Sequence, residues 1–230
     1  MKHVPQTRYF DAAGSGMDIE QFSDAQYLIH LNLSSCTIST VSHNITLPNL
    51  RELDLSYNQL DSFDISSFVH LSNLRVLILS WNPITNIFAS DSKPPIHYNL
   101  DVLYLSGLMI SKFKSEHFKY FPNMRNLIIS SAQFHSIDSL KLFSKLESID
   151  MDNCTFEDFA NDIYSGLKNL KSIRSSNFKL CCPQLLPDHM LVKDCVAPSD
   201  EISSCDNLLR SNTYRLFLWT FAAVAVVGKV

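Results

Sequence analysis

Residues 50–60 read LRELDLSYNQL, and residues 74–84 repeat the same spacing as LRVLILSWNPI. Both stretches place apolar residues at positions one, four, six and eleven, and asparagine at position nine. Positions four and six are separated by a single residue, so both side chains point to one face of a short strand. The asparagine then turns the chain, and we expect its amide to bond the backbone of the neighbouring copy. Each stretch therefore predicts a strand that ends in a polar turn.

The pattern occurs seven times along the chain. Its first positions are Leu28, Leu50, Leu74, Leu100, Met124, Leu146 and Leu170, at spacings of 22, 24, 26, 24, 22 and 24 residues. Cysteine takes position nine in two copies, as Cys36 and Cys154, because a small buried thiol is tolerated there. A period of about 20–29 residues is typical of leucine-rich repeats, in which each coil buries its apolar side chains against its neighbours. We predict an α/β solenoid, a leucine-rich-repeat horseshoe with a parallel β concave face.

Four segments follow from this interpretation: an N-terminal remnant of an earlier repeat (1–27), the repeats (28–180), a cysteine hinge (181–214) and a partial transmembrane helix (215–230). Residues 216–228 read LFLWTFAAVAVVG without a charge. They would span about 20 Å as a helix, against about 30 Å for a bilayer core; the alternative is a buried C-terminal core helix. Because residues 1–10 lack the apolar stretch of a secretory signal, we expect a fragment, or a gene model without its upstream exons.

Candidate ligand-binding residues lie between the leucines, where side chains face the concave side of the sheet. They are Glu52, Asp54, Tyr57, Ile78, Trp81, Asp101 and Tyr104. Aromatic side chains flanked by charges are typical of binding hot spots, and the carboxylates favour a partner that presents arginine or lysine. The alternative for each residue is a solvated position on an exposed sheet. For the group together we predict a surface that binds a basic peptide or protein.

Three acceptor motifs for N-glycosylation support an extracellular setting. They begin at Asn32, Asn44 and Asn153, each followed two residues later by serine or threonine. Glycans on Asn32 and Asn153 would restrict binding to the middle repeats.

Four cysteines follow the last repeat, as Cys181, Cys182, Cys195 and Cys205. Adjacent cysteines rarely meet disulfide geometry, so two pairings remain open. One joins Cys181 to Cys195 and Cys182 to Cys205; the other joins Cys181 to Cys205 and Cys182 to Cys195. A zinc site is a weaker alternative, because adjacent cysteines do not have the usual ligand spacing.

The hinge resembles that of leucine-rich-repeat G-protein-coupled receptors. The resemblance lies in FKLCCPQ (178–184) and in CVAPSDEISSCDNLLRSNTYRLFLW (195–219), and it favours the relaxin-receptor and invertebrate branch. It implies a plasma-membrane receptor with extracellular repeats that bind a peptide or protein hormone. It also implies that a short hinge element relays activation, through Ile202, Cys205, Asp206, Leu208 and Leu209; the alternative is a plain linker held by a disulfide. The family has Gly-Asn where this chain has Gly228-Lys229, and a lysine in mid-membrane would be expensive. Coupling to a G protein would need a seven-helix domain, which does not follow in this sequence.

Other function classes find little support. The net charge is −4, so no broad basic surface indicates nucleic acid. Neither an H-x-x-x-H zinc motif nor a G-x-S-x-G elbow occurs, and we expect no enzyme, cofactor or metal site. Asp150 and Asp152 could pair their carboxylates, but a solvated acidic patch is the simpler interpretation. The second function that the repeats allow is an extracellular adhesion or innate-immune recognition protein with a single membrane anchor.

Overall fold

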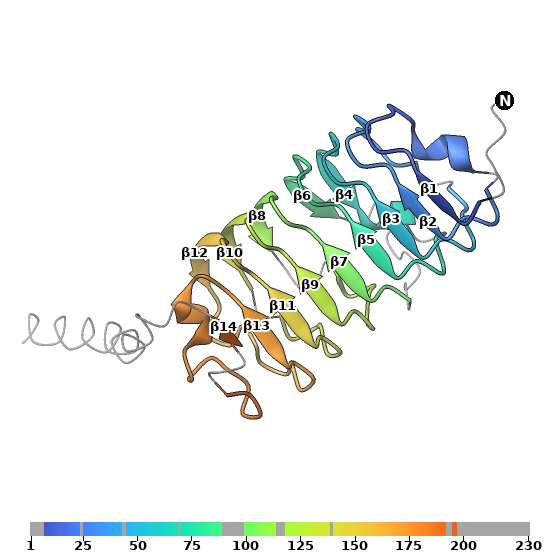
Figure 1. Ribbon diagram of the computed structural model, residues 1–230. Coiled ribbons are helices and arrows are strands. Elements are labelled where there is room, and N and C mark those ends of the chain that lie inside the picture. The colour runs from blue at the N-terminus through green and yellow to red at the C-terminus, as the bar shows by residue number, and fades with distance from the viewer. Residues whose placement is uncertain are drawn as a thin grey trace, which may run out of the picture.

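The computed structural model describes residues 7–23, 25–42, 45–68, 70–88, 99–113, 118–138, 140–191 and 195–196. One parallel sheet of nine short strands runs along this part of the molecule (Figure 1). Its strands, in spatial order, are β1 (Tyr9–Asp11), β2 (His30–Asn32), β3 (Glu52–Asp54), β5 (Val76–Ile78), β7 (Val102–Tyr104), β9 (Asn126–Ile128), β11 (Ser148–Asp150), β13 (Ser172–Arg174) and β14 (Cys195–Val196). The predicted leucine-rich-repeat solenoid is confirmed.

The register of the sheet follows the repeat. Leu31 pairs with Leu53, Leu53 with Leu77, and Leu77 with Leu103, so position four of each copy stacks on position four of the next. These leucines are at most 1% exposed. The core is therefore a column of apolar side chains that only stacked coils can close.

The asparagines of position nine bond neighbouring coils, as predicted. Asn58 accepts hydrogen bonds from the backbone N–H groups of Cys36 and Ile38, both at 2.9 Å, and its amide donates to the Leu33 carbonyl at 2.9 Å. The cysteine copies bond through sulfur, since the Cys154 thiol donates to the Ile129 carbonyl at 2.9 Å. Asparagine or cysteine at this position thus satisfies backbone groups that the turn would leave buried and unpaired.

A second asparagine series, which the sequence analysis missed, lies just before position one of several copies. The side-chain amides of Asn49, Asn73, Asn99 and Asn169 donate to carbonyls of the preceding coil at 2.6–2.8 Å. These four asparagines are exposed. The coils that carry both Asn49 and Asn58, or both Asn73 and Asn82, are therefore bonded to the preceding coil at two corners.

The convex side carries short strands and 3₁₀ turns, and no α-helix occurs among the described residues. Strands β4 (Ser62–Asp64) and β6 (Asn86–Phe88) pair with each other, and β10 (Gln133–Ile137) pairs with both β8 (Met109–Phe113) and β12 (Thr155–Phe159). The 3₁₀ turns are η1 (Ile19–Phe22), η2 (Ile65–Phe68) and η4 (Phe178–Cys181). The return segments are too short for stable helices, and phenylalanines such as Phe63 and Phe68 fill the convex core edge to face.

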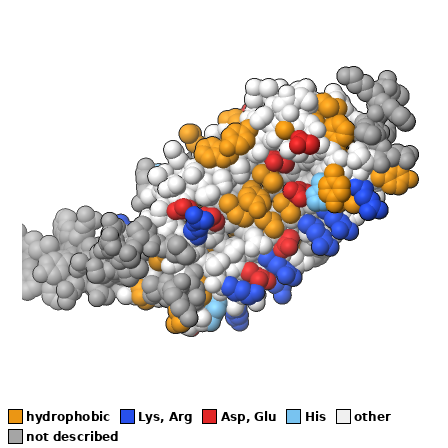
Figure 2. Space-filling view, in the orientation of Figure 1, with side chains coloured by type: hydrophobic (Ala, Val, Ile, Leu, Met, Phe, Trp, Pro, Cys, Tyr) orange, Lys and Arg blue, Asp and Glu red, His pale blue; other side chains and the backbone are white. Residues whose placement is uncertain are grey.

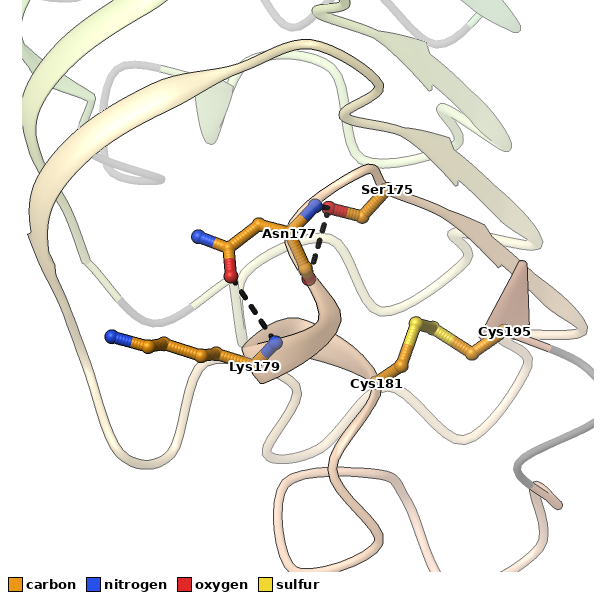
Figure 3. The surroundings of a disulfide bond; sticks show 5 residues. All are labelled: Ser175, Asn177, Lys179, Cys181 and Cys195. Atoms are coloured by element: carbon orange, nitrogen blue, oxygen red, sulfur yellow. Dashed lines mark hydrogen bonds between the residues drawn. A yellow bond between two sulfur atoms is a disulfide. The ribbon is translucent and has the colours of Figure 1, made fainter. Parts of the chain in front are cut away.

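The sheet extends beyond residues 28–180 at both ends. At the N-terminal end, Phe10 of β1 pairs with Leu31 and packs on Phe22 at 5.2 Å between ring centroids, so a further coil precedes the first recognisable copy. At the C-terminal end, Cys195 of β14 pairs with Ile173. A disulfide joins Cys181 to Cys195 (Figure 3). Within the described ranges no helix is long and apolar enough to cross a bilayer; the predicted transmembrane segment, 215–230, lies outside them.

Candidate ligand-binding face

The third residue of each strand forms a column across the concave face. From the first coil to the eighth it reads Asp11, Asn32, Asp54, Ile78, Tyr104, Ile128, Asp150 and Arg174. Apolar side chains occupy the centre of this face and charged side chains flank them, as Figure 2 shows. The column therefore offers an apolar platform between two polar ends.

Beside this platform, two exposed aromatic rings stack on each other. Tyr57 and Trp81 lie with their ring centroids 5.9 Å apart and their planes within 9°. Their side chains are 59% and 46% exposed. On its other side the Trp81 ring covers Gly107, where a Cβ atom would come within 2.4 Å of the indole. The two rings, with Gly107 beneath the indole, thus form a ridge across three coils. We call it the aromatic ridge.

The backbone explains why the ridge is unusual. The residue before position nine has positive φ in successive coils, with values of 56° at Ser35, 55° at Tyr57, 61° at Trp81, 70° at Gly107, 56° at Ser131 and 54° at Asn153. Left-handed backbone costs a non-glycine residue about 1–2 kcal/mol, and asparagine tolerates it better than an aromatic residue does. A tyrosine and a tryptophan therefore occupy positions where local energetics favour glycine or asparagine, and such strain often marks functional sites.

The predicted carboxylates share this face, and each lies near a partner in the chain, although the buried Oδ1 of Asp101 accepts no hydrogen bond among the described residues. Glu52 contacts His30 at 2.8 Å between carboxylate oxygen and Nδ1. Asp54 accepts from the backbone N–H and the hydroxyl of Ser56, at 2.8 and 2.6 Å. Asp101 lies 3.7 Å from the Nε of Arg125. These internal contacts weaken the expectation of a basic partner, which rested on these carboxylates.

Two features of this face were missed in the sequence. Tyr9 stacks on His30 with ring centroids 4.5 Å apart, and the two rings help to line a hollow of about 290 Å³. Arg51 and Arg75 lie directly before strands β3 and β5, at the end of the sheet where its strands begin. The place of the two arginines could have been predicted from the sequence, because both residues follow position one of their copies. Tyr9 precedes every recognisable copy, so the repeat did not predict its place.

Further along the same edge, charges alternate and pair. Arg125 lies 3.7 Å from Asp101 and 3.6 Å from Glu147, and Lys171 donates a hydrogen bond to Glu147. That hydrogen bond, together with the positive charges of Lys171 and Arg125, lowers the pKa of the Glu147 carboxyl.

The predicted glycosylation and hinge residues are only partly described. Asn32 lies in β2, where its side chain accepts from the Ser34 backbone at 2.9 Å, and Asn153 is exposed. The Cys181–Cys195 bond belongs to the first of the two pairings considered, and Cys182 is also disulfide-bonded. Asn44, Cys205 and the signalling positions Ile202, Asp206, Leu208 and Leu209 lie outside the described residues.

The described residues contain no group of three histidine, cysteine or acidic side chains that could hold a metal ion. Asp150 and Asp152 do not act as a free carboxylate pair. Asp150 accepts from the Asp152 backbone at 2.9 Å, and Asp152 lies 3.7 Å from the Nε of Arg174. This cluster is part of the polar flank of the concave face.

Comparison with known proteins agrees with this architecture. A family model described as leucine rich repeat matches residues 43–84. The fold is the leucine-rich-repeat solenoid. Toll-like receptor 3 of Homo sapiens is 30% identical over 154 residues, which cover 64% of this chain and 15% of the receptor. The G-protein coupled receptor GRL101 of Lymnaea stagnalis is 29% identical over 67 residues, which cover 29% of this chain and 6% of that receptor.

A solved structure of a TLR13–ssRNA13 complex superposes with a TM-score of 0.61 at 27% identity, covering 73% of this chain and 23% of that one. Over the residues that align, the chain is therefore similar to parts of receptors. It spans less than a quarter of the length of each of these three relatives. These matches do not reach the relaxin-receptor branch that the hinge residues suggested, so that assignment stays a prediction.

Proposed function

We propose that the chain is a ligand-binding piece of an extracellular receptor and that a peptide or protein ligand binds the concave face beside the aromatic ridge. Its receptor relatives support this role, and the hinge resemblance makes a G-protein-coupled hormone receptor the first candidate. In that receptor, residues 202–209 would relay activation to a membrane domain.

The observation that carries this proposal is the exposed Tyr57–Trp81 stack. Rigid aromatic side chains supply large contact areas at low entropic cost and dominate many interfaces. Here they lie on left-handed backbone and adjoin the platform formed by Ile78 and Tyr104. The same backbone carries serine or asparagine in other coils, so the choice of two exposed aromatic residues at these positions favours a binding role.

The second candidate is an innate-immune recognition or adhesion protein. Similarity to Toll-like receptor 3 covers 64% of this chain, whereas similarity to GRL101 covers 29%. The concave face would be the binding surface in both cases, so a test of that face bears on both candidates.

The test is selection of peptides from a random display library on the full chain, followed by titration of the selected peptides against variants. Tyr57→Asn and Trp81→Asn each remove an aromatic ring while asparagine keeps the left-handed backbone. We expect each to weaken binding by about 2 kcal/mol or more, roughly thirtyfold, as for interface hot spots. Tyr27→Asn is the matched control, because Tyr27 is 60% exposed and lies outside the sheet. Unchanged affinity in both ridge variants would refute the proposed site.

A further inference from the structure

Charged residues form a regular column along the side of the concave sheet where its strands begin. We call this side of the sheet its edge and this column the rim ladder. It consists of Arg51, Arg75, Asp101, Arg125, Glu147 and Lys171, one from each of six successive coils. The backbone N–H of each residue donates to the carbonyl of the one before it, at 2.7–2.9 Å, from Arg75 onward. Neighbouring members are therefore about 4.8 Å apart along the sheet, which is close enough for their charges to interact strongly.

The second half of the rim ladder neutralises itself. From Asp101 to Lys171 the sign of the charge alternates, and Arg125 contacts a carboxylate on each side. Opposite charges on adjacent strands stabilise a sheet, whereas like charges directly opposite each other destabilise it. This half satisfies that rule without any partner.

The first half breaks the rule. Arg51 and Arg75 are adjacent, exposed and of like charge, and among the described residues neither guanidinium forms an ion pair. The neighbouring acids contact other residues: Glu52 contacts His30, and Asp54 bonds Ser56. Asp101, which follows Arg75 in the rim ladder, contacts Arg125. Arg8, also exposed, adds a positive charge to the same column, because its carbonyl accepts from the Ile29 N–H and the Ile29 carbonyl accepts from the Arg51 N–H.

Apolar side chains lie on the strands beside these arginines. Val76 follows Arg75 directly and pairs with Val102, and Ile78 pairs with Tyr104. All four side chains are half-buried. A partner on this part of the sheet would therefore meet free guanidinium groups at the edge and an apolar floor beside them.

We infer that Arg51 and Arg75 dock an acidic segment of a protein partner, whose carboxylates bind the two guanidinium groups while a neighbouring apolar side chain packs on Val76, Ile78 and Tyr104. Guanidinium groups bind carboxylates bidentately, which fixes the direction of the bound segment. The inference rests on the proposed function for the existence of a ligand, and it assigns that ligand a charge opposite to the one that the sequence suggested.

The experiment measures binding of three probes to the full 230-residue chain. They are a fluorescent peptide with a leucine–phenylalanine core flanked by glutamates, its counterpart flanked by lysines, and a heparin octasaccharide. The variant is Arg51→Gln/Arg75→Gln. The matched control is Arg125→Gln/Lys171→Gln, which removes the same charge from the self-neutralised half of the same ladder. Thermal melting checks that both variants are folded, since such surface changes usually alter stability by less than about 0.5 kcal/mol.

We expect the glutamate peptide to bind more tightly than the lysine peptide. The Arg51→Gln/Arg75→Gln variant should weaken it about tenfold, mainly through slower association, and added salt should abolish the difference. The control should change its affinity by less than about twofold. Tighter binding of the lysine peptide, or equal losses in variant and control, would overturn the inference.

Heparin binding that depends on Arg51 and Arg75, without binding of the glutamate peptide, would also overturn it, in favour of a sulfated glycan. The ridge variants separate this inference from the proposed function. Arginine-dependent binding that survives Trp81→Asn would support the acidic docking edge and count against the aromatic ridge. Binding that depends on Trp81 but not on Arg51 and Arg75 would support the aromatic ridge and overturn the acidic docking edge.

Discussion

Gly107 gives the sharpest test of the aromatic ridge, because the chain contains its own control. Gly107 and Gly14 have nearly the same left-handed backbone, with φ of 70° and 66°. Each donates its N–H to the next coil at 2.9 Å, to Ser130 and Ser34 respectively. A Cβ at Gly107 would lie 2.4–2.8 Å from three atoms of the Trp81 ring, whereas a Cβ at Gly14 would meet nothing within 4 Å.

Alanine at either position incurs the left-handed penalty of about 1–2 kcal/mol. At Gly107 it must also displace the indole. Overpacking of this kind costs about 1–3 kcal/mol, and loss of the Tyr57 stack adds about 0.5–1.5 kcal/mol. We therefore expect Gly107→Ala to be about 2–4 kcal/mol less stable than Gly14→Ala. For a domain of this size that corresponds to a melting temperature lower by about 4–16 °C.

The assay is thermal unfolding followed by tryptophan fluorescence. The chain has two tryptophans, so a Trp219→Phe background leaves Trp81 as the single reporter. The native emission of Gly107→Ala should shift to the red as the ring leaves its two neighbours, and that of Gly14→Ala should not. Equal melting temperatures together with identical emission spectra would show that the indole does not cover Gly107 and that the ridge is not preformed.

Four further outcomes follow from other parts of the structure. Asn82→Ala should lower the free energy of unfolding in urea by about 3 kcal/mol, because it leaves buried backbone groups of two coils unpaired. Replacing Cys181 and Cys195 by alanine should cost about 3 kcal/mol, as expected for a bond with a sequence separation of 14, and calorimetry would measure it. Tyr164→Phe should raise stability by about 1 kcal/mol, since that buried hydroxyl has no hydrogen-bond partner among the described residues; a loss in urea titration would contradict this. Burial raises the pKa of the Cys154 thiol from 9.0 to about 12, so its contribution to stability should be full below pH 9.0 and decline as the pH rises toward 12, and iodoacetamide should modify the native protein only slowly at pH 9.0.

The sequence determined the solenoid because the repeat encodes it locally. Leucines at positions four and six must be buried on one side of a strand, and the asparagine at position nine has one low-energy place, in a turn with its amide on the neighbouring backbone. Each of these constraints acts within one coil or between adjacent coils, so a single period of the sequence carries it. The same logic placed Tyr57, Trp81, Ile78 and Tyr104 on the concave side.

Tertiary structure alone decided which of those side chains are free to bind. Glu52, Asp54 and Asp101 have the composition of an acidic patch, but their partners come from neighbouring coils or from a hydroxyl that the turn brings close, and charge counting along the chain does not show this. Along the rim ladder, alternating charges neutralise Arg125, and a break in the alternation leaves Arg51 and Arg75 unpaired. Both effects arise because the fold brings residues 22 to 26 positions apart into register. The stacking of Tyr57 on Trp81, and of Trp81 on Gly107, likewise exists only because successive coils lie about 4.8 Å apart, at the spacing of hydrogen-bonded strands.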